Sequence, residues 1–432
     1  MLNIKFIREN KELVQEAAKK KRLEFDTDKL LEVDDKRKKL LGKVEEKRAE
    51  QKVANNEIVK ADSDGREAIL EKMKVLKGEL DKEEAELKEV MQEWQSLMLL
   101  VPNVPDTSVP AGEGEQDNVT VKEWGKKPKF DFEPKSHVEI MIALDMVDFE
   151  RGAKVHGFRG YFLKNAGVLL SWAIWNYAQH FFLSKNFTPF IAPSIVRKNF
   201  FYGTGHLPTD AEDLYKTQDD DYLSGTAEVP MMAYHADEIL KKEELPKRYL
   251  AFSPCFRREA GSHSKDTKGL IRVHEFYKLE QLVLCEASHD ESVKLHEELN
   301  RNTEEFIESL GIPYRQVVIS TGDLKRAHVK SYDTELWVPL ENTYREIASA
   351  SYYHDFQTRR FNIRYDDDGP STGSGQARLK YVHSLNATAI PTPRILVSLV
   401  ENFQQADGSI KIPEVLVPYM NGLREITRPG SL

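Results

Sequence analysis

The chain has 432 residues, of which 40% are hydrophobic and 31% charged, and its formal net charge is −9 at pH 7. The length favours two domains. The negative charge excludes a globally basic nucleic-acid-binding protein, so any contact with nucleic acid must come from a local basic patch. Two cysteines, Cys255 and Cys285, are too few for a disulfide framework or a zinc site and indicate reduced thiols in a cytoplasmic protein. The N-terminus lacks the apolar core of a secretory signal, and no stretch approaches the ~18 apolar residues that cross a membrane.

The first 100 residues contain 23 Lys and Arg, 24 Asp and Glu, three Gly and no Pro, a composition typical of long solvated helices. An apolar heptad seam extends from Ile69 to Leu97, and a weaker one extends from Leu30 to Val44. Helix-breaking residues at 61–65 separate the two seams. This pattern predicts an antiparallel two-helix coiled coil with its turn at 61–65.

The two predicted helices carry opposite charge. Residues 35–60 have nine basic and five acidic side chains, whereas residues 67–100 have five basic and nine acidic ones. The difference favours a hairpin and leaves one basic flank. Charged side chains interrupt the seams at Arg37 and Glu83. The periodicity alone fits a dimerising coiled coil equally well, but a short seam with a polar far end suits a projecting arm that contacts a partner.

Four prolines and several glycines mark residues 101–128 as a linker; the prolines are Pro102, Pro105, Pro110 and Pro128. Beyond it, apolar β-rich runs alternate with amphipathic helices. The run 276–285 alternates as a long antiparallel strand does, and 394–405, preceded by a proline, is typical of a helix. No Gly-x-Gly-x-x-Gly turn and no Walker-type Gly-Lys-Ser/Thr is present, so neither a Rossmann fold nor a P-loop would hold a nucleotide.

We therefore expect an α+β fold with two domains. Residues 1–110 are predicted to form an N-terminal domain with the two-helix coiled-coil arm. Residues 111–432 are predicted to form a body whose mainly antiparallel sheet is flanked by helices.

Residues 255–281 combine guanidiniums, carboxylates and an aromatic ring. Because side chains repeat with a period of two along a strand, a strand–loop–strand hairpin would align Arg257 with Glu259, and Arg272 with Phe276 and Glu280. Guanidiniums bind phosphate bidentately, an aromatic face stacks on a base for about 1–3 kcal/mol, and a carboxylate accepts from an exocyclic amine. This set matches a bent nucleoside triphosphate. The alternative is a structural ladder of ion pairs on an exposed sheet.

The same segment, from Cys255 to Glu280, resembles motif 2 of the class II aminoacyl-tRNA synthetases, in the form seen in seryl-tRNA synthetases. The resemblance extends along almost the whole chain. It includes residues 1–10, 148–155, 203–208 and, as motif 1 at a dimer interface, 187–193. It implies a bacterial-type class II catalytic domain that activates L-serine with ATP and Mg²⁺ and transfers the seryl group to tRNA(Ser), as a homodimer.

The resemblance also assigns site residues. Catalysis would fall to Arg257, Arg272 and Arg394. Serine would be bound by Thr226, Ala227, Glu228, Arg257, Glu280 and Thr388. ATP would be bound by Arg257, Arg258, Glu259, Arg272, Val273, Phe276, Glu346, Ile347, Ala348, Ser349 and Arg394. Glu346 and Ser349 would supply oxygen ligands for Mg²⁺, which keeps several waters and bridges phosphates.

Residues 386–394 stand where motif 3 belongs, but two expected glycines are replaced by Ala387 and Ala389, with Pro391 and Pro393 nearby. The replacements affect how closely the backbone approaches a ligand. Arg394 keeps its place at the start of the predicted helix.

The resemblance implies that the arm binds the long variable arm of tRNA across a dimer. A net-positive helix that contacts the nucleic-acid backbone would do this, and the candidate residues are Lys36, Lys39, Lys43, Lys47 and Lys52. Two rival interpretations are a ligase of the same fold that loads a carrier protein and a coiled-coil scaffold with an inactive synthetase fold. The sequence leaves open whether tRNA(Sec) is a second substrate.

Overall fold

The computed structural model describes residues 1–260, 266, 268–367 and 379–428. The chain divides into two compact units, Met1–Pro102 and Asn103–Leu432. Among the helices that these ranges contain, none is both long and apolar enough to span a membrane.

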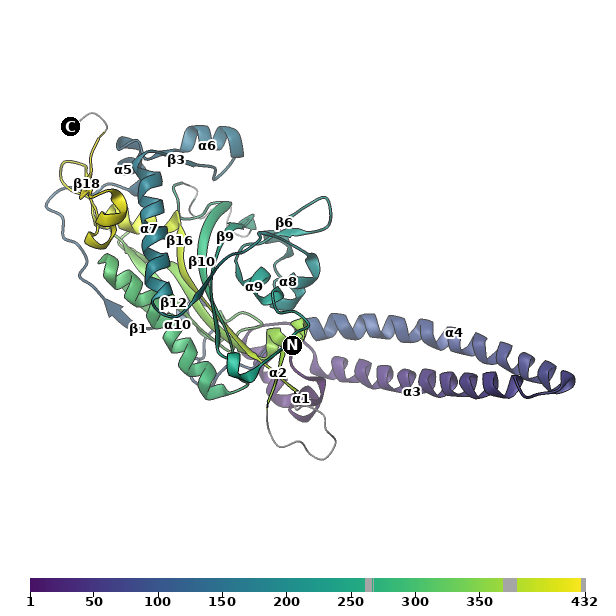
Figure 1. Ribbon diagram of the computed structural model, residues 1–432. Helices are drawn as coiled ribbons and strands as arrows, with labels where there is room; N and C mark the ends of the chain where they lie inside the picture. The colour runs from purple at the N-terminus through teal and green to yellow at the C-terminus, as the bar shows by residue number, and fades with distance from the viewer. Residues whose placement is uncertain (261–265, 267, 368–378, 429–432) are drawn as a thin grey trace. The chain divides into compact units, whose positions relative to one another are not determined.

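The first unit is all helical. Two short helices, α1 (Ile4–Glu9) and α2 (Lys11–Lys20), precede the long helices α3 (Thr27–Ile58) and α4 (Ser63–Leu100). The long helices lie side by side as a hairpin (Figure 1), which confirms the predicted coiled-coil arm. The turn is shorter than predicted, because the Asp62 side chain accepts a hydrogen bond from the Gly65 N–H and starts α4 within the expected turn.

The charged interruptions of the two seams have partners on the opposite helix. The Arg37 guanidinium lies 4.6 Å from the centroid of the Trp94 ring, and Lys47 Nζ lies 3.3 Å from a Glu83 carboxylate oxygen. Each charged side chain therefore has a favourable partner within the interface between the two helices.

Further ion pairs join α3 to α4 along the hairpin: Lys29–Glu93, Lys36–Glu86, Lys43–Glu83, Lys47–Glu79 and Arg48–Glu84. These pairs connect the basic helix to the acidic one, as the charge difference predicted. Most are exposed and so contribute little individually.

The second unit is built on an eight-stranded sheet with the order β1-β11-β12-β13-β16-β10-β9-β4. In that order the strands are Val119–Trp124, Tyr314–Val318, Lys330–Val338, Thr343–His354, His383–Thr392, Glu275–Cys285, Lys247–Phe256 and Thr188–Ile191. Every neighbouring pair is antiparallel except β4 and β9, which run parallel. The mainly antiparallel sheet is therefore confirmed.

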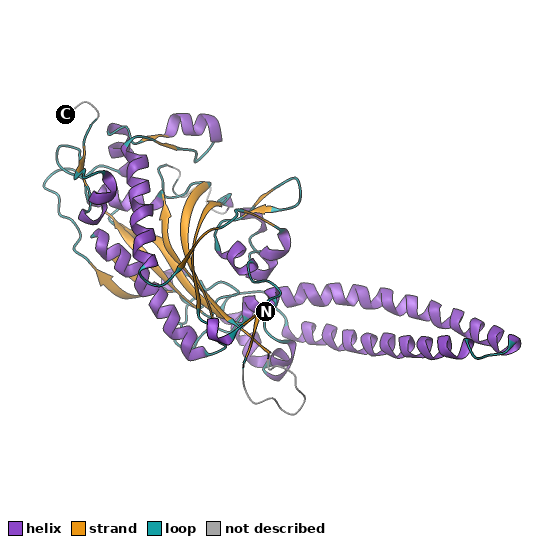
Figure 2. Ribbon diagram, in the orientation of Figure 1, coloured by secondary structure: helices purple, strands orange, loops and turns teal. Residues whose placement is uncertain are grey.

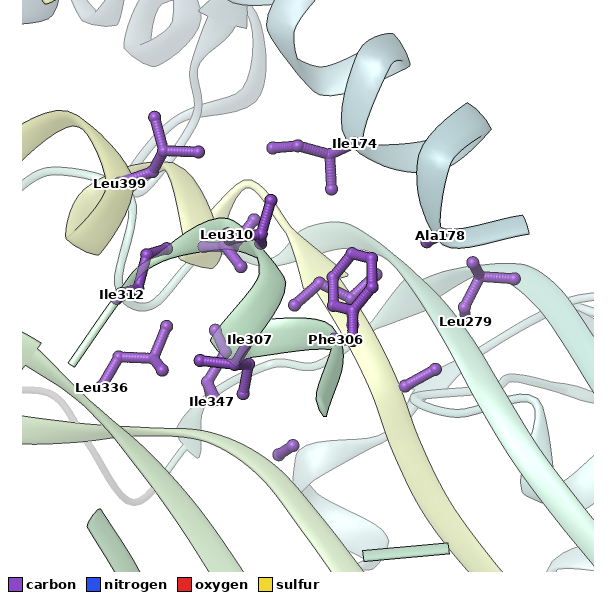
Figure 3. Close-up of a cluster of buried hydrophobic side chains, with 14 of the residues drawn as sticks. Ile174, Ala178, Leu279, Phe306, Ile307, Leu310, Ile312, Leu336, Ile347 and Leu399 are labelled. Atoms are coloured by element: carbon purple, nitrogen blue, oxygen red, sulfur yellow. The ribbon is translucent and has the colours of Figure 1, made fainter. Parts of the chain in front are cut away.

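Two long helices, α7 (Ala166–Leu183) and α10 (His289–Leu310), lie along this sheet (Figure 2). Phe306 and Ile307 of α10 pack with Ile174 of α7, Leu279 of β10 and Ile347 of β13 in one buried cluster (Figure 3). The core therefore holds the central strands that carry candidate site residues on a rigid support.

Shorter helices surround the sheet: α5 (His137–Ala143), α6 (Phe149–His156), α8 (Lys198–Thr204), α9 (Glu228–Ala233), α11 (Phe356–Phe361) and α12 (Arg394–Asn402). The 3₁₀ helices are η1 (Glu115–Asp117), η2 (Ala211–Asp213), η3 (Lys242–Glu244) and η5 (Glu414–Met420). The small strands are β2 (Val147–Asp148), β3 (Phe162–Leu163), β5 (Ile195–Val196), β6 (Tyr215–Lys216), β7 (Tyr222–Leu223), β8 (Ile239–Leu240), β14 (Arg364–Asp366), β15 (Leu379–Tyr381), β17 (Ile410–Lys411) and β18 (Glu425–Ile426).

Candidate active site

The candidate site is a cavity on the sheet face opposite α10. Along β10, Leu279 packs in the core and the Gln281 amide donates to the Leu299 carbonyl of α10, whereas Phe276 and Lys278 line the cavity. The period of two along a strand separates these two sets. The cavity gathers eight of the residues that the sequence assigned to ligands: Arg257, Glu259, Val273, Phe276, Glu346, Ile347, Thr388 and Arg394.

The arginines and Glu259 reach the cavity by a different route from the one predicted. β9 ends at Phe256 and β10 begins at Glu275, so the expected strand alternation is wrong for Arg257, Glu259 and Arg272. The reason is that the chain leaves the sheet: the Arg257 N–H still donates to the His274 carbonyl at 3.0 Å, but the Arg258 N–H donates to Asp213, and Glu259 has a φ of 54°.

The Arg257 guanidinium nevertheless lies 5.4 Å from the centroid of the Phe276 ring. Close by, Arg272 Nη1 donates to Glu259 Oε2 at 3.0 Å and Arg272 Nε donates to Asp266 Oδ2 at 2.9 Å. Burial opposes ionisation of Asp266, but Arg272 and Arg345 outweigh it and hold the pKa of Asp266 below its usual range. Arg272 thus pairs with two carboxylates that an anionic ligand could displace.

Arg394 is the first residue of α12 and its guanidinium is fixed by backbone oxygens. Nε donates to the Ile271 carbonyl at 2.9 Å, and Nη1 donates to the Glu346 carbonyl at 3.1 Å. Burial lowers the pKa of Arg394, although a guanidinium stays charged throughout the physiological range. A rigid cation therefore lies in the cavity wall with Phe276 and Glu346.

A buried polar network lies next to this cavity. Lys278 Nζ donates to Thr226 Oγ1 at 2.8 Å and forms an ion pair with Glu280. Glu228 Oε1 accepts a 2.6 Å hydrogen bond from Gln357 Nε2. Burial, with a smaller contribution from the charge of Glu280, raises the pKa of Glu228. Two carboxylates in one buried network favour a cationic group of a ligand.

Lys278 is a site residue that the sequence interpretation missed. Its signal was present, because Phe276, Lys278 and Glu280 alternate along the predicted strand and therefore share a face. A buried lysine between a predicted base-stacking ring and a predicted serine ligand belongs to the same site.

Carboxylates also gather where β12 meets β13. Asp333 pairs in register with Ser349, and Glu335 with Glu346. Burial, reinforced by the charge of Glu346, raises the pKa of Asp333 well above its usual range. Within the described ranges, no three His, Cys, Asp or Glu side chains converge as a metal site.

The other assigned residues are not part of the lining of this cavity: Thr226, Ala227, Glu228, Arg258, Arg272, Glu280, Ala348 and Ser349. Thr226, Glu228 and Glu280 belong to the buried polar network, and Arg272 pairs with Glu259. Of the candidate lysines on α3, Lys36, Lys43 and Lys47 pair with glutamates of α4. Lys39 and Lys52 are exposed.

Comparison with protein families matches residues 1–105 to the seryl-tRNA synthetase N-terminal domain. Residues 214–403 match the tRNA synthetase class II core domain (G, H, P, S and T). The second match covers the strands β9, β10, β13 and β16, which carry the cavity.

The serine–tRNA ligase of Deinococcus radiodurans is 42% identical over 99% of this chain and 100% of its own length. The crystal structure of seryl-tRNA synthetase from Pyrococcus horikoshii complexed with ATP has a TM-score of 0.89 at 38% identity, covering 99% of this chain and 100% of that one. The cytoplasmic serine–tRNA ligase from Naegleria fowleri, in complex with AMP, has a TM-score of 0.84 at 30% identity, covering 100% of this chain and 99% of that one. The chain belongs to the seryl-tRNA synthetase family.

Proposed function

We propose that this protein activates L-serine with ATP to form seryl-adenylate and then esterifies the seryl group to the 3′ end of tRNA(Ser). One observation carries the proposal. A single cavity brings the Arg257 and Arg394 guanidiniums, the Phe276 ring and the Glu259 carboxylate together, and a buried network with Lys278, Glu228 and Glu280 adjoins it.

The cavity suits a bent ATP molecule. The Phe276 ring and the Arg394 guanidinium sandwich the adenine, and Glu259 accepts from its amino group. Arg257 holds the α-phosphate together with the serine carboxylate. Arg272 exchanges Asp266 for the leaving phosphates, because a phosphate offers a guanidinium a stronger bidentate partner. Arg258, Val273, Ile347 and Ala348 complete the proposed ATP site.

The reaction is an in-line displacement at the α-phosphorus. A serine carboxylate oxygen forms the new P–O bond, and the bond to the pyrophosphate oxygen breaks. A carboxylate is already ionised at pH 7, so activation requires no general base. Catalysis then consists of positioning the reactants and offsetting charge, which is what a set of arginines provides.

The residues present fit Mg²⁺. Glu346 and Ser349 supply hard oxygen donors, and the crowded carboxylates of Asp333, Glu335 and Glu346 favour a cation. Mg²⁺ keeps several waters and is bound through few protein ligands plus substrate phosphates, in agreement with the lack of a three-residue set in the described part of the chain. When bound, Mg²⁺ would offset negative charge on the phosphates of ATP.

Serine binds next to the cavity, in the buried polar network, at Thr226, Ala227 and Glu228. Glu228 receives the ammonium group, and Glu280 with Thr388 binds the hydroxyl. A site built to hydrogen-bond a hydroxyl rejects alanine, because its own buried polar groups would stay unpaired. Threonine is excluded by the size of the pocket.

The first unit binds tRNA(Ser) through the basic helix α3. The protein forms a homodimer, so its protein partner is a second copy of the same chain. Support for this comes from a cavity of about 690 Å³ between α6, β3 and α7 and from two large exposed apolar side chains, Trp172 on α7 and Ile191 within motif 1. As a component of protein synthesis, the enzyme works in the cytoplasm with Cys255 and Cys285 reduced; both cysteines are free and buried.

The decisive experiment is serine-dependent ATP–pyrophosphate exchange, measured separately with each of the twenty amino acids. Serine should give the only strong response, and subsequent addition of tRNA(Ser) should yield seryl-tRNA. A strong response to a different amino acid refutes the assignment. Exchange with serine but transfer to a carrier protein instead of tRNA identifies the carrier-loading alternative.

A further inference from the structure

We propose that Arg159 is a positioning residue for ATP selection, which holds the Glu259 carboxylate against the adenine amino group while Arg272 is engaged by phosphate. The inference rests on the proposed function, because it assigns Glu259 to the amino group of ATP. It adds a residue from outside motifs 1, 2 and 3.

Arg159 belongs to a segment, residues 149–161, that contacts both sides of motif 2. Arg159 Nη1 lies 3.8 Å from Glu259 Oε2, after β9. On the other side, His156 Nε2 lies 3.2 Å from His274 Nδ1, and the Tyr161 hydroxyl donates to the Glu275 carbonyl at 3.2 Å. The segment therefore holds the end of one strand and the start of the next in a fixed relationship.

The segment is packed tightly against itself. A Cβ atom added at Gly152 would lie 2.4 Å from the Tyr161 Cα atom, and one added at Gly160 would lie 2.4 Å from the Gly152 carbonyl oxygen. Helix α6 and the turn that follows it are thus in backbone contact. Arg159 therefore projects from a rigid segment. Such rigidity is needed to hold Glu259, the group that contacts the adenine, in a fixed position.

The two arginines that share Glu259 differ in their surroundings. Arg272 Nη1 lies 3.0 Å from Glu259 Oε2, but its side chain is 34% exposed and also pairs with Asp266. The Arg159 side chain is 2% exposed. When Arg272 turns to the phosphates of ATP, the buried Arg159 guanidinium stays beside Glu259.

A buried carboxylate needs such a cation. Without Arg159, the Glu259 carboxylate would turn toward another partner, and it would no longer accept from the adenine amino group. The loss affects only nucleotides that carry the amino group, which separates positioning of Glu259 from a general effect on the fold.

The test compares kcat/KM for ATP with kcat/KM for purine riboside triphosphate, which has the same ring without the amino group, in serine-dependent pyrophosphate exchange. The wild-type enzyme should prefer ATP. Arg159→Gln should lower the ATP-to-purine ratio by about tenfold or more, mainly through KM for ATP, and leave activity with the purine analogue nearly unchanged. Arg159→Lys, which keeps the charge, should restore part of the ratio.

Two further variants sharpen the comparison. Arg151→Gln, on helix α6 just before the turn that carries Arg159, changes an exposed arginine that pairs with Asp148 and should leave the ratio unchanged. In a Glu259→Gln background, Arg159→Gln should have no additional effect on the ratio, because both changes remove one interaction.

An equal loss of activity with both nucleotides, or a ratio that Arg159→Gln does not move, overturns the inference even where the wild-type enzyme exchanges serine normally. A wild-type enzyme without preference for ATP also overturns it. A wild-type enzyme with no serine-dependent exchange at all contradicts the proposed function itself, so the two failures are distinguishable.

Discussion

Lys278 Nζ donates a 2.8 Å hydrogen bond to Thr226 Oγ1, which joins strand β10 to the residues just before α9. The same ammonium group forms the ion pair with Glu280, and both side chains are buried. One lysine therefore fixes the two chain segments to which serine is assigned. Substitution of Lys278 should therefore lower both the stability of the fold and the binding of serine.

Lys278→Met should lower the free energy of unfolding by about 3–5 kcal/mol, because it leaves Glu280 as an uncompensated buried charge. It should also raise KM for serine. Urea unfolding at pH 7 and pyrophosphate exchange measure the two effects.

The matched variant is Lys278→Met combined with Glu280→Gln. Removing both charges should recover a large part of the stability, since a buried pair can be replaced by neutral groups at little cost. Serine activation should stay low. If the single variant is as stable as the wild type, Lys278 does not neutralise Glu280.

Glu228 should trade stability for substrate binding. Its pKa is raised, first by burial and then by the charge of Glu280, so the folded state without serine disfavours the ionised carboxylate. That cost is fully present above the raised folded-state pKa and disappears below the ordinary value of 4.5. Glu228→Gln should therefore raise the free energy of unfolding at pH 7 by about 1 kcal/mol, and the gain should vanish as the pH falls toward 4.5.

The same variant should lose serine activation, because a neutral amide does not offset the ammonium group. In the wild-type enzyme, KM for serine should rise as the pH falls through the raised pKa of Glu228, whereas KM for the variant should be high at every pH. Denaturant unfolding and exchange kinetics across the pH range give both profiles. A pH-independent KM in the wild type would remove Glu228 from the ammonium site.

Arg394→Lys keeps the charge but loses the fixed planar guanidinium that is assigned to the adenine, and it should lower kcat/KM for ATP by about 10²-fold or more, as removal of one preorganised donor does. The guanidinium spans two carbonyls, those of Ile271 and Glu346, and a single ammonium nitrogen lacks this planar fork. Steady-state pyrophosphate exchange measures the effect. Arg424→Lys is the control, because Arg424 is exposed and pairs with Glu414; it should behave as the wild type.

The sequence predicted most reliably where the deciding interactions are local. The heptad pattern gave the hairpin, and the alternation along residues 276–285 gave the face that Phe276 presents to the cavity. It failed for Arg257 and Glu259, whose positions depend on the distant Asp213 carbonyl that binds the Arg258 N–H and draws the chain away from the sheet. No periodicity signals such a contact.

The same limit applies to charge partners. Arg37 and Glu83 interrupt the seams in the sequence, yet each lies against a partner on the opposite helix, Trp94 and Lys47. The contact of Arg159 with Glu259, 100 positions later in the chain, forms only when the second unit folds. Such pairs need three-dimensional placement, because local spacing carries no information about them.

The arm lysines should divide into two groups. Lys39 and Lys52 are exposed on α3, and no ion pair of either is found among the described residues. Lys39→Gln with Lys52→Gln should weaken tRNA(Ser) binding and reduce the slope of log K against log salt by roughly 0.7–0.9 per lost phosphate contact. Thermal stability should stay unchanged, because few intramolecular contacts are lost.

Lys36→Gln with Lys47→Gln is the matched pair of changes. This double variant removes the same charge but also breaks contacts with Glu86, Glu79 and Glu83 on α4, so it should lower the melting temperature of the arm. It should weaken tRNA binding less than the Lys39 and Lys52 changes do, because Lys36 and Lys47 are already paired with glutamates. Serine-dependent pyrophosphate exchange requires no tRNA and should be normal in both double variants. Loss of exchange in either double variant would show that the arm contributes to serine activation. Equal salt slopes of tRNA binding in the two double variants would show that ion pairs with α4 do not decide which lysines contact tRNA.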